Sequence, residues 1–470
     1  MAFLSLAENA PLMRALLVLA VALLLFVAPI AGGTSPAGTA ADIETPEVPD
    51  DPRVATMDVG VSPVLGPTMA EPNSDGPATG SSGAPSTDGT VEAASVDEGN
   101  LTLRVLSTQP DVTPRVGATQ RDANLGTALD LSVGEVDAAL RTETTLQRIE
   151  SAEDSAERQR RILAAINEVE QDEVSLDSRQ TAAMNAHANG ELTDRELLDE
   201  LVRVAAVAAE YDHRLDLLDE VAEETDGFSS PGRLDELQVQ LQVYEGPVRE
   251  RALETVRGDT PGAQIHVESS QQAVVLATVD GDEYVREAFR RDRWDRGGGT
   301  LSSEAAIDAA IASYPETTAL REPDAFGAGS VQRITVPHEF GTLRSFVSGG
   351  TEQVFVEHQR IGLDRFPDAD TVSTTEDGFN VTVDRSYPGG PVTVTVRDAE
   401  TGDPVSGITV TKSVDGGDSE TIGATNADGV VRALSPAETY RITVIDEPRV
   451  AVIDGIQPIE TPRLTDDGGS

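Results

Sequence analysis

The feature that most constrains the fold is a long helical segment that begins at Thr193. Glu196 follows three residues later, which forms a capping box, because the threonine hydroxyl and the glutamate carboxylate each satisfy an amide that the first helical turn leaves free. Apolar side chains then recur at steps of four and three: Leu197, Leu201, Val204, Ala208, Tyr211, Leu215, Leu218 and Ala222. This sustained heptad seam predicts a coiled-coil-like helix that buries one face.

A second helix of similar length is predicted over residues 155–188. It carries Ile162, Ile166, Val169 and Leu176 on one face, and Asn189-Gly190 supplies residues that tolerate positive φ at a helix end. Two long helices joined by a tight turn must lie antiparallel, so the pair is a hairpin. A third apolar stripe covers residues 234–248 and is interrupted by Gly246-Pro247. It predicts a third helix that either folds back on the hairpin or continues beyond it.

The helical region as a whole is predicted to span residues 131–258. Two arrangements stay open for it: the hairpin can pack within one chain, or it can pair with a second copy as a homodimer. His187 and His213 are expected to be solvated polar positions, since a metal site needs two or more ligands that converge.

From residue 262 the apolar period changes from helical to two. Strands are predicted at 265–267, 274–279 and 284–289, with a turn at 280–282 between the last two. A helix follows over residues 302–314, and Pro315 ends it. Strand-like runs at 331–337, 341–347 and 353–358 complete a predicted small α+β domain over 262–366.

Part of this domain resembles a known module. Residues 301–306 and 312–315, followed by residues 345–354, are similar to the PepSY-type module, which covers residues 300–360 here. The resemblance implies an extracytoplasmic protein and, in some members, restraint of a peptidase. Ser348 departs from the pattern, which has an acidic residue before the glycine turn.

Residues 375–458 read as short strands with turn signals at regular spacing, the pattern of a β-sandwich. The turn at 401–405 and the hairpin at 426–429 resemble those of Ig-like modules of the invasin and carboxypeptidase-regulatory kind. The resemblance implies a spacer or a binding platform. Residues 459–470 are predicted to be a disordered tail.

The amino terminus has the pattern of a secretory signal. Arg14 precedes an apolar run at 15–28, and Pro29 and small residues end the segment at 33. Residues 1–33 are therefore a signal peptide or, if uncleaved, a signal-anchor transmembrane helix, and Met1 and Met13 both remain possible starts. Residues 34–99, rich in Pro, Gly, Ser, Thr and acids, are predicted to be a disordered spacer. Residues 100–130 are predicted to hold a short strand at 101–106 and a linker.

The charge of the chain indicates a protein adapted to high salt. The 470 residues carry a formal net charge of −47, and Lys412 is the only lysine among 35 basic residues. Molar salt screens such self-repulsion, because the Debye length falls to about 3 Å. No basic stripe suits nucleic acid, so no nucleic-acid partner is expected. Cysteine is absent, which excludes disulfides and thiolate metal sites.

The remaining candidate sites are few. Arg290, Arg291, Arg293, Trp294 and Arg296 form a basic cluster that can dock an acidic surface or pair with the chain's own carboxylates. Glycosylation sequons occur at Asn100 and Asn380. No catalytic residue, cofactor site or metal site is predicted, and the loop carboxylates lack the spacing of a calcium loop.

These observations predict a multidomain α+β protein with a helical hairpin, a small α+β domain and a carboxy-terminal Ig-like β-sandwich. The chain, including residues 156–163, resembles uncharacterised exported haloarchaeal proteins. We expect a non-enzymatic extracytoplasmic protein of a halophilic archaeon, secreted or membrane-tethered, with a structural or interaction role at the cell envelope. The partner is a protein or an envelope component. The alternative is a PepSY-like regulator of an extracellular peptidase.

Overall fold

The computed structural model describes residues 102–464, except residues 328, 368, 415 and 416. The predicted signal segment, the predicted spacer, Asn100 and the last six residues of the chain lie outside the described residues. The α+β class predicted for the chain is confirmed.

The first part of the described chain is a helical layer. Its members are α2 (Leu125–Glu150), α3 (Ser155–Ala188), α4 (Asp194–Glu223), α5 (Gly232–Gln242) and α6 (Pro247–Arg257). The predicted hairpin is confirmed, because α3 and α4 pack along each other and are joined by the Asn189-Gly190 turn, where Gly190 has φ 78°. Both hydrogen bonds of the Thr193–Glu196 capping box are present, and every residue of the predicted α4 seam is buried.

Two helices change the predicted outline of this layer. Helix α2 crosses residue 130, where we placed the boundary between a linker and the helical region. The interruption at Gly246-Pro247 is present, but it starts a further helix, α6, because proline at the first helical position has no amide to leave unpaired. Gly258 in the left-handed region then ends α6.

Strands β1 to β8 form one eight-stranded antiparallel sheet in the order β1-β2-β3-β4-β8-β7-β6-β5. The strands predicted after residue 262 are confirmed; the sheet comprises β1 (Arg115–Arg121), β2 (Ala263–Ser269), β3 (Ala273–Asp280), β4 (Glu283–Arg290), β5 (Asp324–Phe326), β6 (Val331–His338), β7 (Gly341–Ser348) and β8 (Val354–Gly362). Strand β1 was not predicted. It lies in the expected linker, far from β2 in sequence, and pairs with β2 along its whole length.

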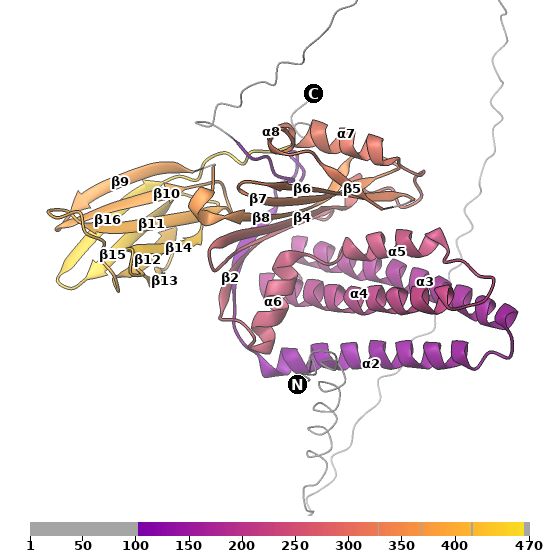
Figure 1. The fold of residues 1–470 in the computed structure, drawn as a ribbon. Helices are drawn as coiled ribbons and strands as arrows, with labels where there is room; N and C mark the ends of the chain where they lie inside the picture. Colours follow the sequence, from indigo (N-terminus) through magenta and orange to yellow (C-terminus); the bar gives the residue numbers. More distant parts are fainter. Residues whose placement is uncertain (1–101, 328, 368, 415–416, 465–470) are drawn as a thin grey trace, which may run out of the picture. The chain divides into compact units, whose positions relative to one another are not determined.

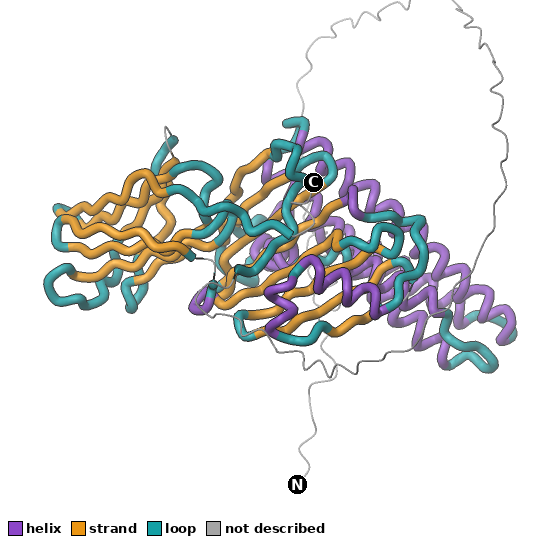
Figure 2. Tube along the Cα trace, turned by 90° about the horizontal axis from the view of Figure 1, so that it is seen from above, coloured by secondary structure: helices purple, strands orange, loops and turns teal. Residues whose placement is uncertain are grey.

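Helices cover both faces of this sheet (Figures 1 and 2). On one face, side chains of α3–α6 share a single apolar core with strand residues such as Val267, Phe346 and Val356. On the other face, α7 (Ser303–Ser313) packs with Ile334, Val336 and other strand residues, and α8 (Pro315–Leu320) contacts β6. The helical region and the α+β region therefore share a core.

The two ends of the described chain meet on the α7 face. Residues 101–106 were predicted to form a strand, but among residues 102–106, which the structure describes, only Val105 forms a bridge, to Arg463. Residues 459–464 were predicted to be disordered, yet Leu464 is buried beside Leu106 and the Val105 amide donates to the Pro462 carbonyl over 2.8 Å. A nonlocal contact orders each segment, and local sequence patterns do not report such contacts.

The carboxy-terminal part is a sandwich of two four-stranded antiparallel sheets, ordered β14-β11-β10-β9 and β13-β12-β15-β16. Its strands are β9 (Asp370–Glu376), β10 (Phe379–Arg385), β11 (Pro391–Asp398), β12 (Thr409–Val414), β13 (Glu420–Ala424), β14 (Val430–Leu434), β15 (Tyr440–Asp446) and β16 (Arg449–Ile456). Alternate valines on β10, β11 and β12 fill the core between the sheets. The predicted sandwich is confirmed, and it begins at Asp370, five residues before the expected boundary.

Candidate functional site

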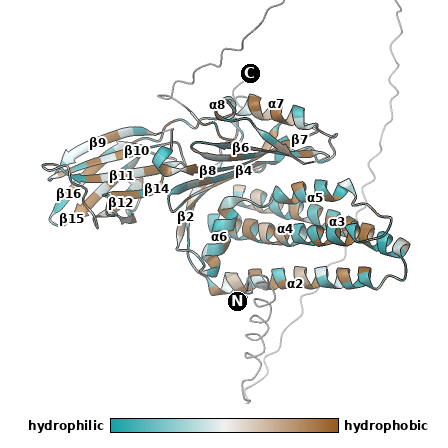
Figure 3. Cartoon of the chain, viewed as in Figure 1, coloured by the Kyte–Doolittle hydropathy of each residue, from teal (hydrophilic) through white to brown (hydrophobic). Residues whose placement is uncertain are grey.

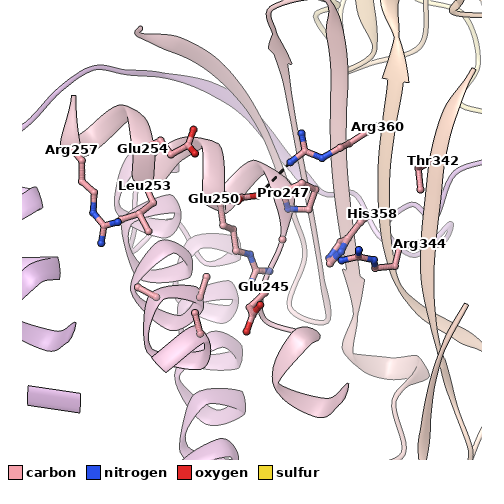
Figure 4. Close-up of a pocket in the computed structure, with 15 residues that line it drawn as sticks. Glu245, Pro247, Glu250, Leu253, Glu254, Arg257, Thr342, Arg344, His358 and Arg360 are labelled. Carbon is pink, nitrogen blue, oxygen red and sulfur yellow. Dashed lines mark hydrogen bonds and ion pairs between the residues drawn. The ribbon is translucent and has the colours of Figure 1, made fainter. Parts of the chain in front are cut away.

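A pocket of about 600 Å³ lies between the helical layer and strands β7 and β8 (Figure 4). Helix α4 lines it with small residues, and α6 and the sheet line it with charged ones. Four arginines and three glutamates line it: Arg249, Arg257, Arg344, Arg360, Glu245, Glu250 and Glu254. In a chain with 82 acidic and 35 basic residues, a pocket in which arginine outnumbers glutamate stands against the average composition.

The sheet side of the pocket is basic. Arg344 on β7 lies directly opposite His358 on β8, and Arg360 lies two residues further along the same face. Arg360 is held by Glu250 over 3.3 Å and by Glu283 over 3.6 Å. Arg344 is exposed and makes no hydrogen bond or ion pair with any residue that the structure describes. One guanidinium therefore has its donors free.

His358 is a buried histidine beside that guanidinium. Its side chain is 6% exposed and packs edge-on against Phe346, with ring centroids 5.6 Å apart. Burial, together with Arg344, Arg249 and Arg360, lowers the pKa of His358 to about 3. The imidazole is therefore neutral at ordinary pH, and it forms no hydrogen bond within the described part of the chain. Figure 4 shows His358 and Arg344 side by side, pointing toward the segment that carries Glu245.

The helix side of the pocket is acidic, and its key group is Glu245. Burial raises the pKa of Glu245 to about 7, and nearby Asp212 contributes in the same direction. Its Oε1 is buried without a hydrogen-bond partner. Burial and Asp216 likewise raise the pKa of Asp212 to about 6. A carboxyl group that is protonated near neutral pH donates a hydrogen bond, so Glu245 can donate to a bound anion.

A buried ion pair holds the pocket's rim in place. Arg249 Nε donates to Glu287 Oε1 over 2.7 Å, and both side chains are almost fully buried. Glu287 also accepts the Val248 amide over 3.0 Å at the start of α6, and Arg249 reaches Gln180 on α3 over 2.8 Å. Gly246 is required here, because a Cβ at that position would overlap the Glu287 carboxylate.

The chemistry of this arrangement is that of an anion site. Arg344 can offer a guanidinium fork to a carboxylate or phosphate group, and Arg360 adds positive charge beside it. The neutral His358 imidazole and the protonated form of Glu245 can add hydrogen bonds. Within residues 102–464, as far as they are described, no cluster of three or more histidine or acidic side chains could hold a metal ion.

The predicted basic cluster lies elsewhere, and its arginines are engaged within the chain. Arg291 pairs with Asp177 over 3.3 Å, Arg296 pairs with Glu173, and Arg290 bonds Asp292 over 2.9 Å and the Ser107 carbonyl. Arg293 is buried and bonds the Val354 carbonyl. Trp294 is 4% exposed and stacks on Phe355. Three of these arginines, Arg290, Arg291 and Arg296, thus pair with the chain's own carboxylates.

Two other polar positions were assessed from the sequence. Asn380 is exposed on β10, where its side chain faces away from the sandwich core. The expectation for His187 is wrong: it is fully buried at the end of α3 and bridges Ser269 Oγ at 2.6 Å and Asp194 Oδ1 at 2.8 Å. A buried strand and the start of α4 meet there, which the hairpin pattern alone does not show. His213 is exposed on α4, as expected.

Sequence reasoning missed the pocket. Its one signal was alternation, since Val356 and His358 share one face of the strand predicted at 353–358 and Arg360 continues that face beyond it. The partner wall comes from α4 and α6, which are distant in the chain, so only tertiary packing brings Glu245 near Arg344.

Models of known protein families match most of the chain. Residues 7–261 match the family described as a domain of unknown function, DUF7096. The match covers more than half of the chain, and the chain belongs to this family.

Two further matches cover the rest. Residues 265–367 match a family of unknown function, DUF7094, and residues 370–453 match the archaeal fibronectin-III type-like domain. The pocket therefore joins elements of both families of unknown function. No curated protein and no solved structure matches the chain. None of the described helices has the length and apolar character needed to cross a membrane.

Proposed function

We propose that this protein is a non-enzymatic interaction protein of the archaeal cell envelope in high salt, and that it binds an anionic group of its partner in the pocket at Arg344. The proposal rests on Arg344, whose N–H donors have no partner among the described residues. Arg344 lies opposite His358, which is neutral and makes no hydrogen bond there. A carboxylate or phosphate oxyanion would satisfy both side chains. The fibronectin-III-like domain supports an interaction role, since such sandwiches are common as spacers and binding platforms.

The binding test uses the full chain in a constant high concentration of sodium chloride. Inorganic phosphate and glutarate are titrated separately by isothermal calorimetry, so that the two oxyanion classes are distinguished. We expect one of them to bind, and Arg344→Gln to weaken binding by roughly tenfold or more, as for loss of a charge-assisted hydrogen bond. Arg365→Gln is the matched control, because Arg365 is exposed and lies outside the pocket. Absence of binding, or equal affinity in the Arg344 variant, overturns the pocket's role.

The proposed location has its own test. Fractionation of the native host, with amino-terminal sequencing of the mature protein, should recover the chain outside the cytoplasm, either cleaved after the apolar segment or still tethered. Recovery of the intact chain in the cytosol overturns it.

The alternative, regulation of an extracellular peptidase, draws on the order of elements from α7 to β8, a helix followed by an antiparallel meander as in the PepSY-type resemblance. Capture of an extracellular peptidase by the immobilised chain, with inhibition of its turnover, would favour this function. A capture experiment that recovers no peptidase would remove it.

A further inference from the structure

Helix α2 exposes a continuous apolar stripe. Its members are between 46% and 76% exposed: Leu125, Leu129, Val133, Val136 and Leu140. They recur at steps of three or four residues, so they lie on one side of the helix. The opposite side of α2 faces the core and buries Leu131, Ala138 and Ile149. Helix α2 is the outermost of the helices in Figure 1, and hydrophobic residues recur along it in Figure 3.

Such a stripe is unfavourable in the expected solvent. Exposed apolar surface costs free energy in water, and salts that are excluded from the protein surface increase that cost. In an otherwise acidic chain, five large apolar side chains along one face indicate a surface that another molecule covers.

We propose that this stripe is the interface between two copies of the chain, which pack α2 against α2 in antiparallel orientation. The spacing supports a two-fold axis, because Leu125 and Leu140 lie equally far from the midpoint between Ser132 and Val133. Leu129 and Val136 are also placed symmetrically about that point. An isologous dimer therefore sets Leu125 against Leu140 of the second copy, and Leu129 against its Val136.

The charges beside the stripe allow this approach. Three acids that flank the middle of the stripe are already paired within their own copy: Asp130 with Arg203 over 2.8 Å, Glu135 with Arg257, and Asp137 with Arg141 over 2.9 Å. These three acids therefore bring no unpaired charge to the middle of the contact. The same pairs argue against a membrane surface, for which an amphipathic helix carries an excess of lysine and arginine.

The area is sufficient for a specific contact. Five side chains of this size and exposure offer about 500 Å² per copy, so two copies remove about 1,000 Å² from water, the lower bound for a biological interface. Neighbouring residues of α2 would add to that area.

Oligomeric state tests the contact directly. The full chain in high salt should sediment as a dimer, and the double variant Leu129→Glu/Val136→Glu should weaken the dimer by roughly 100-fold, because central apolar contacts dominate such interfaces. The control is Leu163→Glu/Val174→Glu, which adds the same charge at exposed apolar positions on α3 and should remain dimeric. Circular dichroism of each variant confirms that it is folded.

Cysteine cross-linking tests the orientation, since the native chain has no cysteine. Val133→Cys lies beside the proposed axis and should form an intermolecular disulfide on oxidation, whereas Leu129→Cys should not. Cross-linking of both variants indicates parallel helices, and cross-linking of neither indicates another contact; each overturns the antiparallel dimer. A monomer at all concentrations also overturns it, including one whose stripe is covered by residues 1–101 or that binds lipid vesicles through α2.

Discussion

At the residue scale, arginine side chains pair with carboxylates inside the fold and so offset part of the chain's excess negative charge. Arg286 pairs with Glu357 deep in the α7 face of the sheet, where Glu357 also accepts from the Tyr314 hydroxyl over 2.7 Å and from the Leu106 amide over 2.6 Å. Even the only lysine is turned inward, since Lys412 Nζ donates to the Leu434 carbonyl over 3.1 Å. Arg344 is not used in this way, and it lines the pocket beside His358.

The buried His358 predicts a pH dependence of stability. Its pKa is about 3 in the folded chain and about 6.5 when unfolded, so the unfolded state binds more protons between these values. Stability is therefore lost as pH falls from 6.5 toward 3, and this group alone costs about 2 kcal/mol at pH 5. His358→Gln should gain stability over the native chain as pH falls through this window, measured by urea unfolding in high salt.

Exposed His213 on α4 provides the control for this measurement. His213→Gln makes the same substitution at an exposed position, so it accounts for any general effect of replacing histidine by glutamine. An unchanged pH profile for His358→Gln would contradict the buried, neutral state of that imidazole.

At the element scale, the helical layer is joined to the sheet by polar contacts as well as by the apolar core. Glu287 on β4 binds the first turn of α6, and Arg249 on α6 reaches α3 through Gln180. His187 joins the end of α3 to β2 and to the start of α4. These contacts fix the wall of the pocket relative to the strands that carry Arg344 and His358.

The Glu287–Arg249 pair yields a stability prediction. Glu287→Ala should lower the free energy of unfolding by about 3–5 kcal/mol, because it leaves a buried guanidinium uncompensated. Replacing both partners, in Arg249→Met/Glu287→Met, should recover part of the loss. Urea unfolding in high salt measures both variants.

An exposed ion pair is the control, because it separates the effect of burial on stability from the effect of removing a charge. Asp137→Asn breaks the pair with Arg141, whose side chain is 56% exposed, and should cost less than about 0.5 kcal/mol. Equal losses in the buried and exposed variants would show that Glu287 is not buried in solution.

Individual elements differ in how far the sequence predicted them. The α3–α4 hairpin was predicted with its caps, because capping boxes and heptad seams are local signals. The ends of helix α2 were not predicted. An amphipathic helix normally shows one apolar stripe, whereas α2 has apolar residues on two sides, so its sequence lacks that single pattern. Strand β1 was missed because its partner β2 lies far along the chain.

At the scale of the whole molecule, net charge dominates. A net charge of −47 on 470 residues opposes the compact state unless salt screens it. We therefore expect the melting temperature of the full chain to rise by about 10 °C or more between 0.2 M and 3 M sodium chloride, measured by circular dichroism.

Sucrose serves as the control for this salt effect, because it favours burial without screening charge. It should raise the melting temperature less than sodium chloride does. A melting temperature that does not respond to salt would contradict adaptation to a saline environment.

The sequence by itself determined the α+β class, the helical hairpin, the strands after residue 262 and the carboxy-terminal sandwich, because periodicity, caps and turns act over a few residues. Only the tertiary structure decided that the helical layer and the sheet share one core, that residues 102–108 and 459–464 meet, and that Arg344, His358 and Glu245 line one pocket. Those features depend on contacts between residues far apart in the chain, and the energy of such contacts comes from burial that no local pattern records.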